Sequence, residues 1–436
     1  MLAWGLKRRE NTPRQRTAMR KAPRGAIISM MLGTMVACSS DTGTTDPGTP
    51  VKIDWAPCIN DLDAPSWFAV QNGAGAWARV VPTSGVFSFT VTAEKIGIAR
   101  YANGALNVDY QTAAELQTNS PKCNSARRTV TGTLIGYSPL DNINIQADAG
   151  SAFVSGTQTA PAPFALSLVT PDPFDVLAVR SRSTKVGSTF QVTPTSVLIR
   201  RAQNSASLAL LDLNSATESG APLSKTVTVA NAATGENIFV AGSLSTPTTD
   251  ALISSYSTTL GPVTGNVSAP FYGLAGTRLA TSETQVVGVI ASQNPTASTT
   301  DSRYAAVNFT DVADKTATLG VALGPVSLTG SARPAASYTI QSGYDQLFEL
   351  DLDQGSGVSS RSIQVVMSRA YLGATATQVT LAVPDLTGLT AFNPNWQLNP
   401  GTSAAWTFFA ANATLDIYRH NRQTYVGASR SSTFIP

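Results

Sequence analysis

The chain has 436 residues, of which 42% are hydrophobic and 13% are charged, with 30 Lys and Arg against 27 Asp and Glu. Residues 1–37 hold eight of those basic side chains and one acidic one, so removing them leaves 22 and 26, a net charge of −4 in place of +3. This balance gives no ground for nucleic-acid binding, and the scarcity of Glu and Lys disfavours solvated helices. The composition is dominated by Thr, Ser, Ala, Val, Gly and Leu, and together with the scarcity of charge this favours many short strands over solvated helices.

The N-terminus has the organisation of an export signal. Eight Lys and Arg residues with one acid precede the apolar run Ala26–Ala37, which ends in small residues before Cys38. A run of 12 residues is too short to span a bilayer. A basic region, an apolar region and small residues at a cleavage site are typical of a secretory signal peptide. We therefore predict that residues 1–37 are a signal peptide.

Met35-Val36-Ala37-Cys38 resembles the lipobox of bacterial lipoproteins, with Met where the family usually has Leu. The resemblance implies that the signal is removed before Cys38 and that Cys38 becomes the lipidated N-terminus, which would anchor the protein to a membrane of the cell envelope. Ser39 after the cysteine resembles the pattern sorted to the outer membrane in Gram-negative cells. An unlipidated secretory signal with an unrelated cysteine is the alternative. Residues 38–51 are polar and rich in Gly and Pro, which predicts a disordered tether.

Two further cysteines, Cys58 and Cys123, form an even pair once Cys38 is assigned to lipidation. In an oxidising compartment such a pair predicts one disulfide bond. Its loop would contribute about 4 kcal/mol to stability in the chain-entropy model. Two buried thiols or a metal site are the alternatives, although no His or additional Cys lies near either residue in the sequence.

Residues 52–125 predict a small β domain that this disulfide would close. Aromatic and β-branched runs at 67–71, 76–81, 86–91 and 96–101 are separated by turn residues, including Asn72-Gly73-Ala74-Gly75. A short helix is indicated at 112–117. The expected core residues are Trp67, Trp77, Phe87, Phe89, Ile98 and Tyr101.

Three more β domains are expected, at 126–202, 203–328 and 329–436, because short strands and turn residues continue in the same rhythm. The first of these resembles, in its strand spacing alone, small sandwich modules of bacterial surface proteins and of carboxypeptidase-like regulatory domains. The predicted fold is therefore all-β, a tandem of antiparallel sandwich-like domains. A β-propeller is the alternative, although no signature repeats at a fixed period of 40–50 residues.

Few residues suggest catalysis or metal binding. His420 is the single histidine, and a turn between two strand-like runs explains it better than catalysis does. Asp351 and Asp353 lie two residues apart on one face of an expected strand, followed by Gly355, which resembles the opening of a calcium loop without its later ligands. Asp351 and Asp353 are therefore candidate metal ligands, although solvated acids at the end of a strand are the simpler interpretation. No cofactor is expected.

The C-terminal segment carries Tyr418, Arg419, Arg422 and Tyr425, which could form a shallow patch for an anionic polysaccharide. A solvated edge hairpin explains the same residues. From the sequence we expect a lipid-anchored cell-envelope protein with a structural, ligand-binding or partner-binding role, its partner an envelope protein or a polysaccharide. The alternative is an extracellular hydrolase that uses two carboxylates, for example on polysaccharide.

Overall fold

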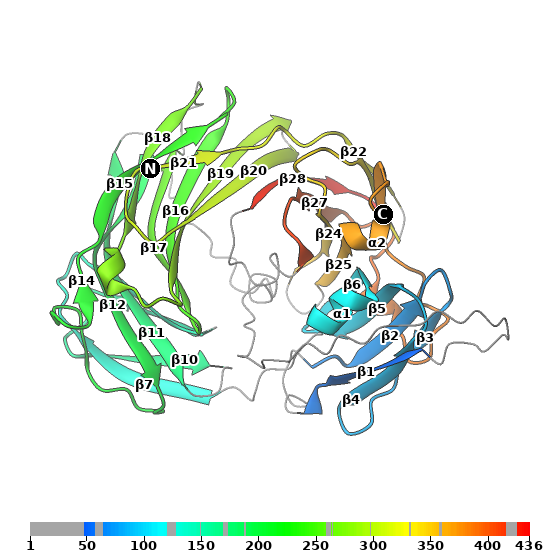
Figure 1. Cartoon of the computed structure of the whole chain (residues 1–436), viewed down its shortest axis with the longest axis horizontal. Helices are drawn as coiled ribbons and strands as arrows, with labels where there is room; N and C mark the ends of the chain where they lie inside the picture. Colours follow the sequence, from blue (N-terminus) through cyan, green and yellow to red (C-terminus); the bar gives the residue numbers. More distant parts are fainter. Residues whose placement is uncertain are drawn as a thin grey trace, which may run out of the picture.

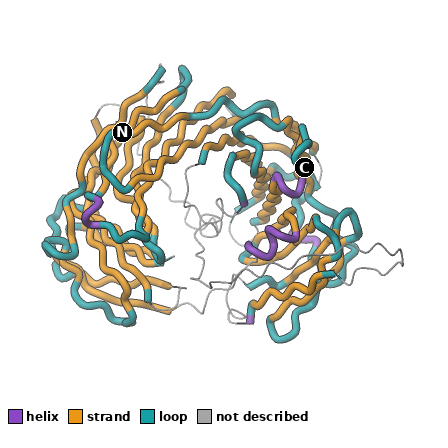
Figure 2. The backbone as a smooth tube through the Cα atoms, viewed as in Figure 1, coloured by secondary structure: helices purple, strands orange, loops and turns teal. Residues whose placement is uncertain are grey.

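A computed structural model of the whole chain gives the fold. Its described residues are 48–56, 64–119, 128–148, 150–168, 173–186, 189–258, 263, 265–296, 298–330, 333–356, 360–415 and 425–436. Within them nearly all regular secondary structure is β-strand, and the strands form four two-layer units arranged around an arc (Figures 1 and 2). We call these the first (49–119), second (128–220), third (223–319) and fourth (326–434) units.

The first unit places a two-stranded sheet, β1–β4, over part of a longer sheet that contains β2, β5 and β6. Helix α1 begins directly after β6, where Thr112 and Glu115 form a capping box: the Thr112 amide donates to the Glu115 carboxylate and the Glu115 amide donates to the Thr112 hydroxyl. The elements are β1 (Thr49–Asp54), β2 (Trp67–Asn72), β3 (Trp77–Arg79), β4 (Val86–Val91), β5 (Lys95–Ala102), β6 (Ala105–Thr112) and α1 (Ala113–Asn119).

Strand β1 corrects the predicted tether, which was expected to continue to residue 51. The strand already begins at Thr49 and pairs in antiparallel register with β4, from Thr49 opposite Val91 to Asp54 opposite Val86. Pro50 made this stretch resemble coil. Strand β1 lies at a sheet edge, where a residue without an N–H group is tolerated.

The second unit pairs the sheet β10–β7–β13 with strands β8, β9, β11, β12 and β14. Leu208, Leu211 and Leu213 belong to its buried core, so this core extends past residue 202, where the sequence suggested a boundary. Gly132 faces the Phe164 ring at a distance that leaves no room for a Cβ atom. The strands are β7 (Arg128–Ile135), β8 (Asn142–Ala147), β9 (Gly150–Ser155), β10 (Ala162–Leu168), β11 (Phe174–Val186), β12 (Thr189–Gln203), β13 (Leu211–Asp212) and β14 (Ser219–Gly220).

The third unit covers β16, β17, β19 and β20 with the sheet β18–β15–β21. Its core encloses an ion pair: Arg303 bonds Glu236 and also donates to the carbonyls of Gly320 and Asn231. These extra bonds satisfy the guanidinium and make its burial tolerable. The elements are β15 (Leu223–Ala230), β16 (Asn237–Ser245), β17 (Asp250–Thr258), β18 (Val267–Gly273), η3 (Gly276–Arg278), β19 (Thr284–Thr296), β20 (Thr299–Phe309) and β21 (Lys315–Thr318).

The fourth unit covers β24, β25, β27 and β28 with the sheet β22–β23–β26. Alternate residues of β24, among them Phe348, Leu350 and Leu352, face this cover and are fully buried. The elements are β22 (Val326–Thr329), β23 (Ala335–Thr339), β24 (Leu347–Gln354), β25 (Arg361–Ser368), α2 (Arg369–Leu372), β26 (Gln378–Ala382), η5 (Pro394–Trp396), β27 (Ala404–Ala411) and β28 (Val426–Phe434).

The four units share one continuous long sheet. Its strands pair in the order β9-β8-β11-β12-β17-β16-β19-β20-β28-β27-β24-β25-β6-β5-β2-β3, with β14 added beside β12. All of these pairs are antiparallel except β25–β6, which is parallel. The first unit therefore joins the fourth, and not the second that follows it in the chain (Figure 1).

The prediction of an all-β, sandwich-like fold is confirmed. Over the described ranges the strands form stacked sheets and no propeller, so that alternative is wrong. In the third and fourth units the covering sheets lie on the outer side of the arc, and the long sheet turns its other side inward (Figure 1). We call that other side the inner face.

Candidate functional site

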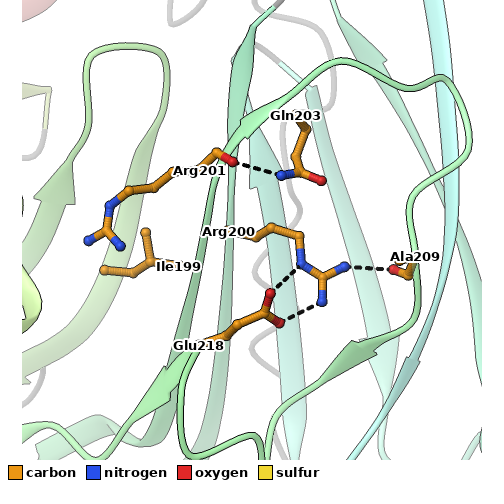
Figure 3. Close-up of a pocket in the computed structure, with 6 residues that line it drawn as sticks. All are labelled: Ile199, Arg200, Arg201, Gln203, Ala209 and Glu218. Carbon is orange, nitrogen blue, oxygen red and sulfur yellow. Dashed lines mark hydrogen bonds and ion pairs between the residues drawn. The ribbon is translucent and has the colours of Figure 1, made fainter.

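An open pocket lies at the end of β12 and has a volume of about 390 Å³ (Figure 3). Its charged side chains are fully engaged within the protein. Arg200 bonds both carboxylate oxygens of Glu218 and the carbonyls of Ala209 and Leu210. The remaining lining residues are Ile199, Arg201 and Gln203.

Arg201 leaves this pocket and joins the second unit to the third. It donates to both oxygens of Glu283, at 2.6 and 2.8 Å, and to the carbonyl of Arg278. The hydrogen bond to Glu283 raises the pKa of Arg201, despite the opposing effect of burial. A guanidinium held in this way keeps its charge and has a structural partner, so we interpret the pocket as part of a clasp between units.

A row of polar side chains crosses the inner face of six adjacent strands. We define the polar row as one residue from each of β20, β28, β27, β24, β25 and β6, each opposite the next in the strand register. All six side chains are at least partly exposed. The row consists of Thr300, Ser431, Thr407, Asp351, Gln364 and Asn107.

Hydrogen bonds connect parts of the polar row. The hydroxyls of Thr407 and Ser431 lie 3.0 Å apart. The Gln364 amide donates to Asp351 at 3.3 Å and to the neighbouring Glu349 at 2.6 Å, which brings two carboxylates to one nitrogen. Asn107 extends the row into the first unit and donates to the Ala105 carbonyl. Strands fix these positions, because each side chain stands on a paired backbone.

Aromatic rings lie beside the polar row on the same face. Tyr304 and Phe409 meet edge to face, with centroids 5.7 Å apart and an angle of 75° between their planes. The Tyr304 hydroxyl lies 3.0 Å from the Ser429 hydroxyl. Tyr425 is partly buried, and burial together with neighbouring Tyr304 raises the pKa of Tyr425. The site therefore combines hydroxyls, carboxylates and two amides with the partly exposed rings of Tyr304 and Phe409.

Asp351 and Asp353 lie on β24 as the sequence suggested, on the inner face with Glu349. Glu349 is buried, with 4% exposure. Within the described ranges, no group of three or more His, Cys, Asp and Glu side chains is arranged to hold a metal ion. A metal at Asp351 and Asp353 stays a prediction that this geometry does not strengthen.

The other predicted site residues are only partly placed. Tyr425 is described and precedes β28. The remaining ones lie outside the described residues, so the predicted lipidation, disulfide, histidine and basic patch stay predictions; they are Cys38, Cys58, Cys123, Tyr418, Arg419, His420 and Arg422.

Sequence reasoning missed most of the polar row. A signal was present in β28, where Ser429, Ser431 and Thr433 alternate with residues that face the core side. Alternation of this kind identifies a polar face of one strand. It does not say which strands lie alongside, so the row became visible only in the assembled sheet.

Comparison with known proteins adds no assignment, because no family model and no curated protein matches the chain significantly. Across the parts of the chain that the structure describes, no helix has the length and apolar character needed to cross a membrane.

Proposed function

We propose that this is a lipid-anchored protein of the cell envelope that binds a ligand or partner on the inner face of its long sheet. The polar row carries this proposal. It brings Thr300 from the third unit, four side chains from the fourth and Asn107 from the first into one line. The residues from the third and fourth units stand on a rigid sheet face turned away from the cores of those units, which suits them to recognition. At Asn107 the same side of the sheet continues into the core of the first unit, where Ile98 lies opposite Asp109.

The rigidity of this face comes from the seams between units. Six residue pairs join β20 to β28, and six join β25 to β6. The binding residues are therefore held in position before a ligand arrives. Preorganisation of this kind lowers the entropy lost on binding.

The anchoring half of the proposal is supported by the lipobox resemblance at Met35–Cys38. A lipidated Cys38 with two or more acyl chains gives stable membrane attachment. We expect the wild-type protein in the membrane fraction and Cys38→Ser either in the soluble fraction or unprocessed. Labelling with a radioactive fatty acid measures lipidation directly, and unchanged labelling of Cys38→Ser would contradict the anchor.

The binding half is tested by obstructing the inner face. Ala405 is exposed on β27 of that face, next to the polar row, so Ala405→Arg adds bulk and charge without opening the core. Thr316→Arg is the matched control, because Thr316 is exposed on β21 of an outer sheet. All three proteins are made in a soluble form without Cys38, so that the lipid anchor cannot carry them into the pellet. In this form we expect the wild-type sequence and Thr316→Arg to co-sediment with isolated envelope material and Ala405→Arg to bind at least tenfold less. Equal binding of all three would contradict this location.

A second function, hydrolysis by two carboxylates, is favoured by the approach of Glu349 and Asp351 to one amide. Such enzymes pair an acid with a base or a nucleophile. Binding remains the better-supported proposal, because Glu349 is buried and hydrogen-bonded to Gln364. Release of reducing ends from a polysaccharide by the wild type, lost in Glu349→Gln, would replace binding with hydrolysis.

A further inference from the structure

We infer that the polar row binds an extended, uncharged polysaccharide that lies across the strands. This inference rests on the proposed function and names its ligand class. Three properties of the inner face lead to it: its charge, its mixture of hydrogen-bond donors and acceptors, and its length beside aromatic rings.

Charge excludes a polyanion. On the inner face of the six strands of the polar row, the described positions carry four carboxylates, from Glu349, Asp351, Asp353 and Asp109, and neither Lys nor Arg. Arg100 of the next strand, β5, lies opposite Asn107 and bonds Asp109, so carboxylates still outnumber cations among the described positions of this face. Arg430 and Arg303 belong to the same strands but alternate to the opposite side, where they bond Asp301 and Glu236. An anionic polymer would be repelled along this face, so the ligand is neutral or cationic.

The donors and acceptors favour a neutral polyhydroxyl ligand over a cationic peptide. Thr300, Ser431 and Thr407 contribute hydroxyls, which donate and accept, while Gln364 and Asn107 contribute amides with both capacities. Sugar hydroxyls have the same dual capacity. Lysine and arginine groups only donate, so they could bond the acceptors of this row but not its hydroxyl and amide donors.

The length of the row indicates a polymer. Adjacent strands lie about 4.8 Å apart, so a row of six strands extends over roughly 24 Å. This span exceeds a single sugar ring, and a repeating chain would meet a polar side chain at every strand. Tyr304 and Phe409, partly exposed beside the row, add apolar surface for the C–H faces of sugar rings.

The test is affinity electrophoresis of the mature protein in gels that contain one polymer each. The neutral probes are hydroxyethyl cellulose, xyloglucan, laminarin and mannan; the anionic probe is polygalacturonate, and a Lys-rich peptide is tested separately in solution. We expect at least one neutral polymer to retard the wild type and Thr316→Arg, and the apparent dissociation constant to rise at least tenfold in Ala405→Arg. Tyr304→Phe keeps the ring and should bind as the wild type does, whereas Tyr304→Ala should weaken retardation several-fold.

The possible failures are distinguishable. If no neutral polymer retards the wild type while Ala405→Arg still abolishes co-sedimentation with envelope material, the ligand class is wrong and the binding face stands. Binding of the Lys-rich peptide alone would assign a cationic protein partner and overturn the inference. Retardation by polygalacturonate alone would overturn the charge argument. Retardation that Ala405→Arg leaves unchanged would place glycan binding elsewhere.

Discussion

The seam between the fourth and first units differs from the seam between the third and fourth, although each pairs six residues of one strand with six of another. At the fourth–first seam the units share a hydrophobic core. Trp67 of β2 is buried against Phe392 and Trp396 and donates to the Thr390 carbonyl, and Tyr101 stacks on Trp396 at 4.2 Å.

At the third–fourth seam the side-chain contacts include an ion pair on the core side and the Tyr304–Phe409 ring contact on the inner face. Arg430 donates to both carboxylate oxygens of Asp301, at 2.7 and 2.9 Å, directly across the β20–β28 pair. The hydrophobic cores on either side are separate clusters. Two seams with the same number of paired backbone residues can therefore differ in whether the units share a hydrophobic core. The side chains at the seam determine this difference.

The largest expected effect comes from Trp67→Ala. Removing this buried ring should lower the free energy of unfolding by about 3–5 kcal/mol. Because the core is shared, hydrogen exchange should show lost protection in both β1–β6 and β24–β28. Phe271→Ala, in the core of the third unit, is the matched control and should leave the first unit protected. Lost protection confined to the first unit after Trp67→Ala would disprove the shared core.

A smaller effect is expected from Arg430→Met, which leaves Asp301 without its partner across the third–fourth seam. The Asp301 side chain is 13% exposed, so we expect a loss of about 2 kcal/mol. Combining it with Asp301→Asn should recover part of this loss, which a double-mutant cycle by urea denaturation measures. Additive losses would mean that the pair does not couple the units.

Tyr344→Phe tests, through pH, a bond between the fourth unit and the segment that follows the third unit in the chain. The Tyr344 hydroxyl donates to the Val321 carbonyl at 2.5 Å, and burial raises the pKa of Tyr344 to about 12. A raised pKa means that its contribution is complete below pH of about 10 and is lost as pH rises toward about 12. At neutral pH the variant should be about 1 kcal/mol less stable. Denaturation at increasing pH should show this difference shrinking, and a constant difference would contradict the assignment.

The smallest effect is expected from Asp385→Asn. Asp385 pairs with Arg333 on the surface of the fourth unit, and hydrogen bonds from Thr387, followed by that of Arg333, lower the pKa of Asp385 to about 2. The pair is exposed and bridges no seam, so the denaturation midpoint should not change measurably at neutral pH. A shift in the midpoint as large as that of Arg430→Met would show that an ion pair does not need to lie at a seam to stabilise the fold.

The sequence was sufficient to predict the positions of strands such as β4 and β25 and of the short helix α1. Runs such as 86–91 and 362–367 correspond to β4 (Val86–Val91) and β25 (Arg361–Ser368), and the helix indicated at 112–117 corresponds to α1. These features are local, because alternation and capping involve residues within a few positions of one another. The burial of Trp67, Phe87 and Ile98 was also predictable, since large apolar residues alternate along their strands.

Tertiary structure alone decided which core each residue joins. Trp67, Trp77 and Tyr101 were expected in the core of the first unit, yet they pack with the fourth, whereas Phe87 and Ile98 stay in the first. The pairing of β6 with β25 and the assembly of the polar row depend on strands that are far apart in the chain. The alternation of polar and apolar residues determines which side chains share a face of one strand, but it does not determine which strand lies next to it. Loop-closure entropy rises only slowly with loop length, so distant pairings compete well with local ones.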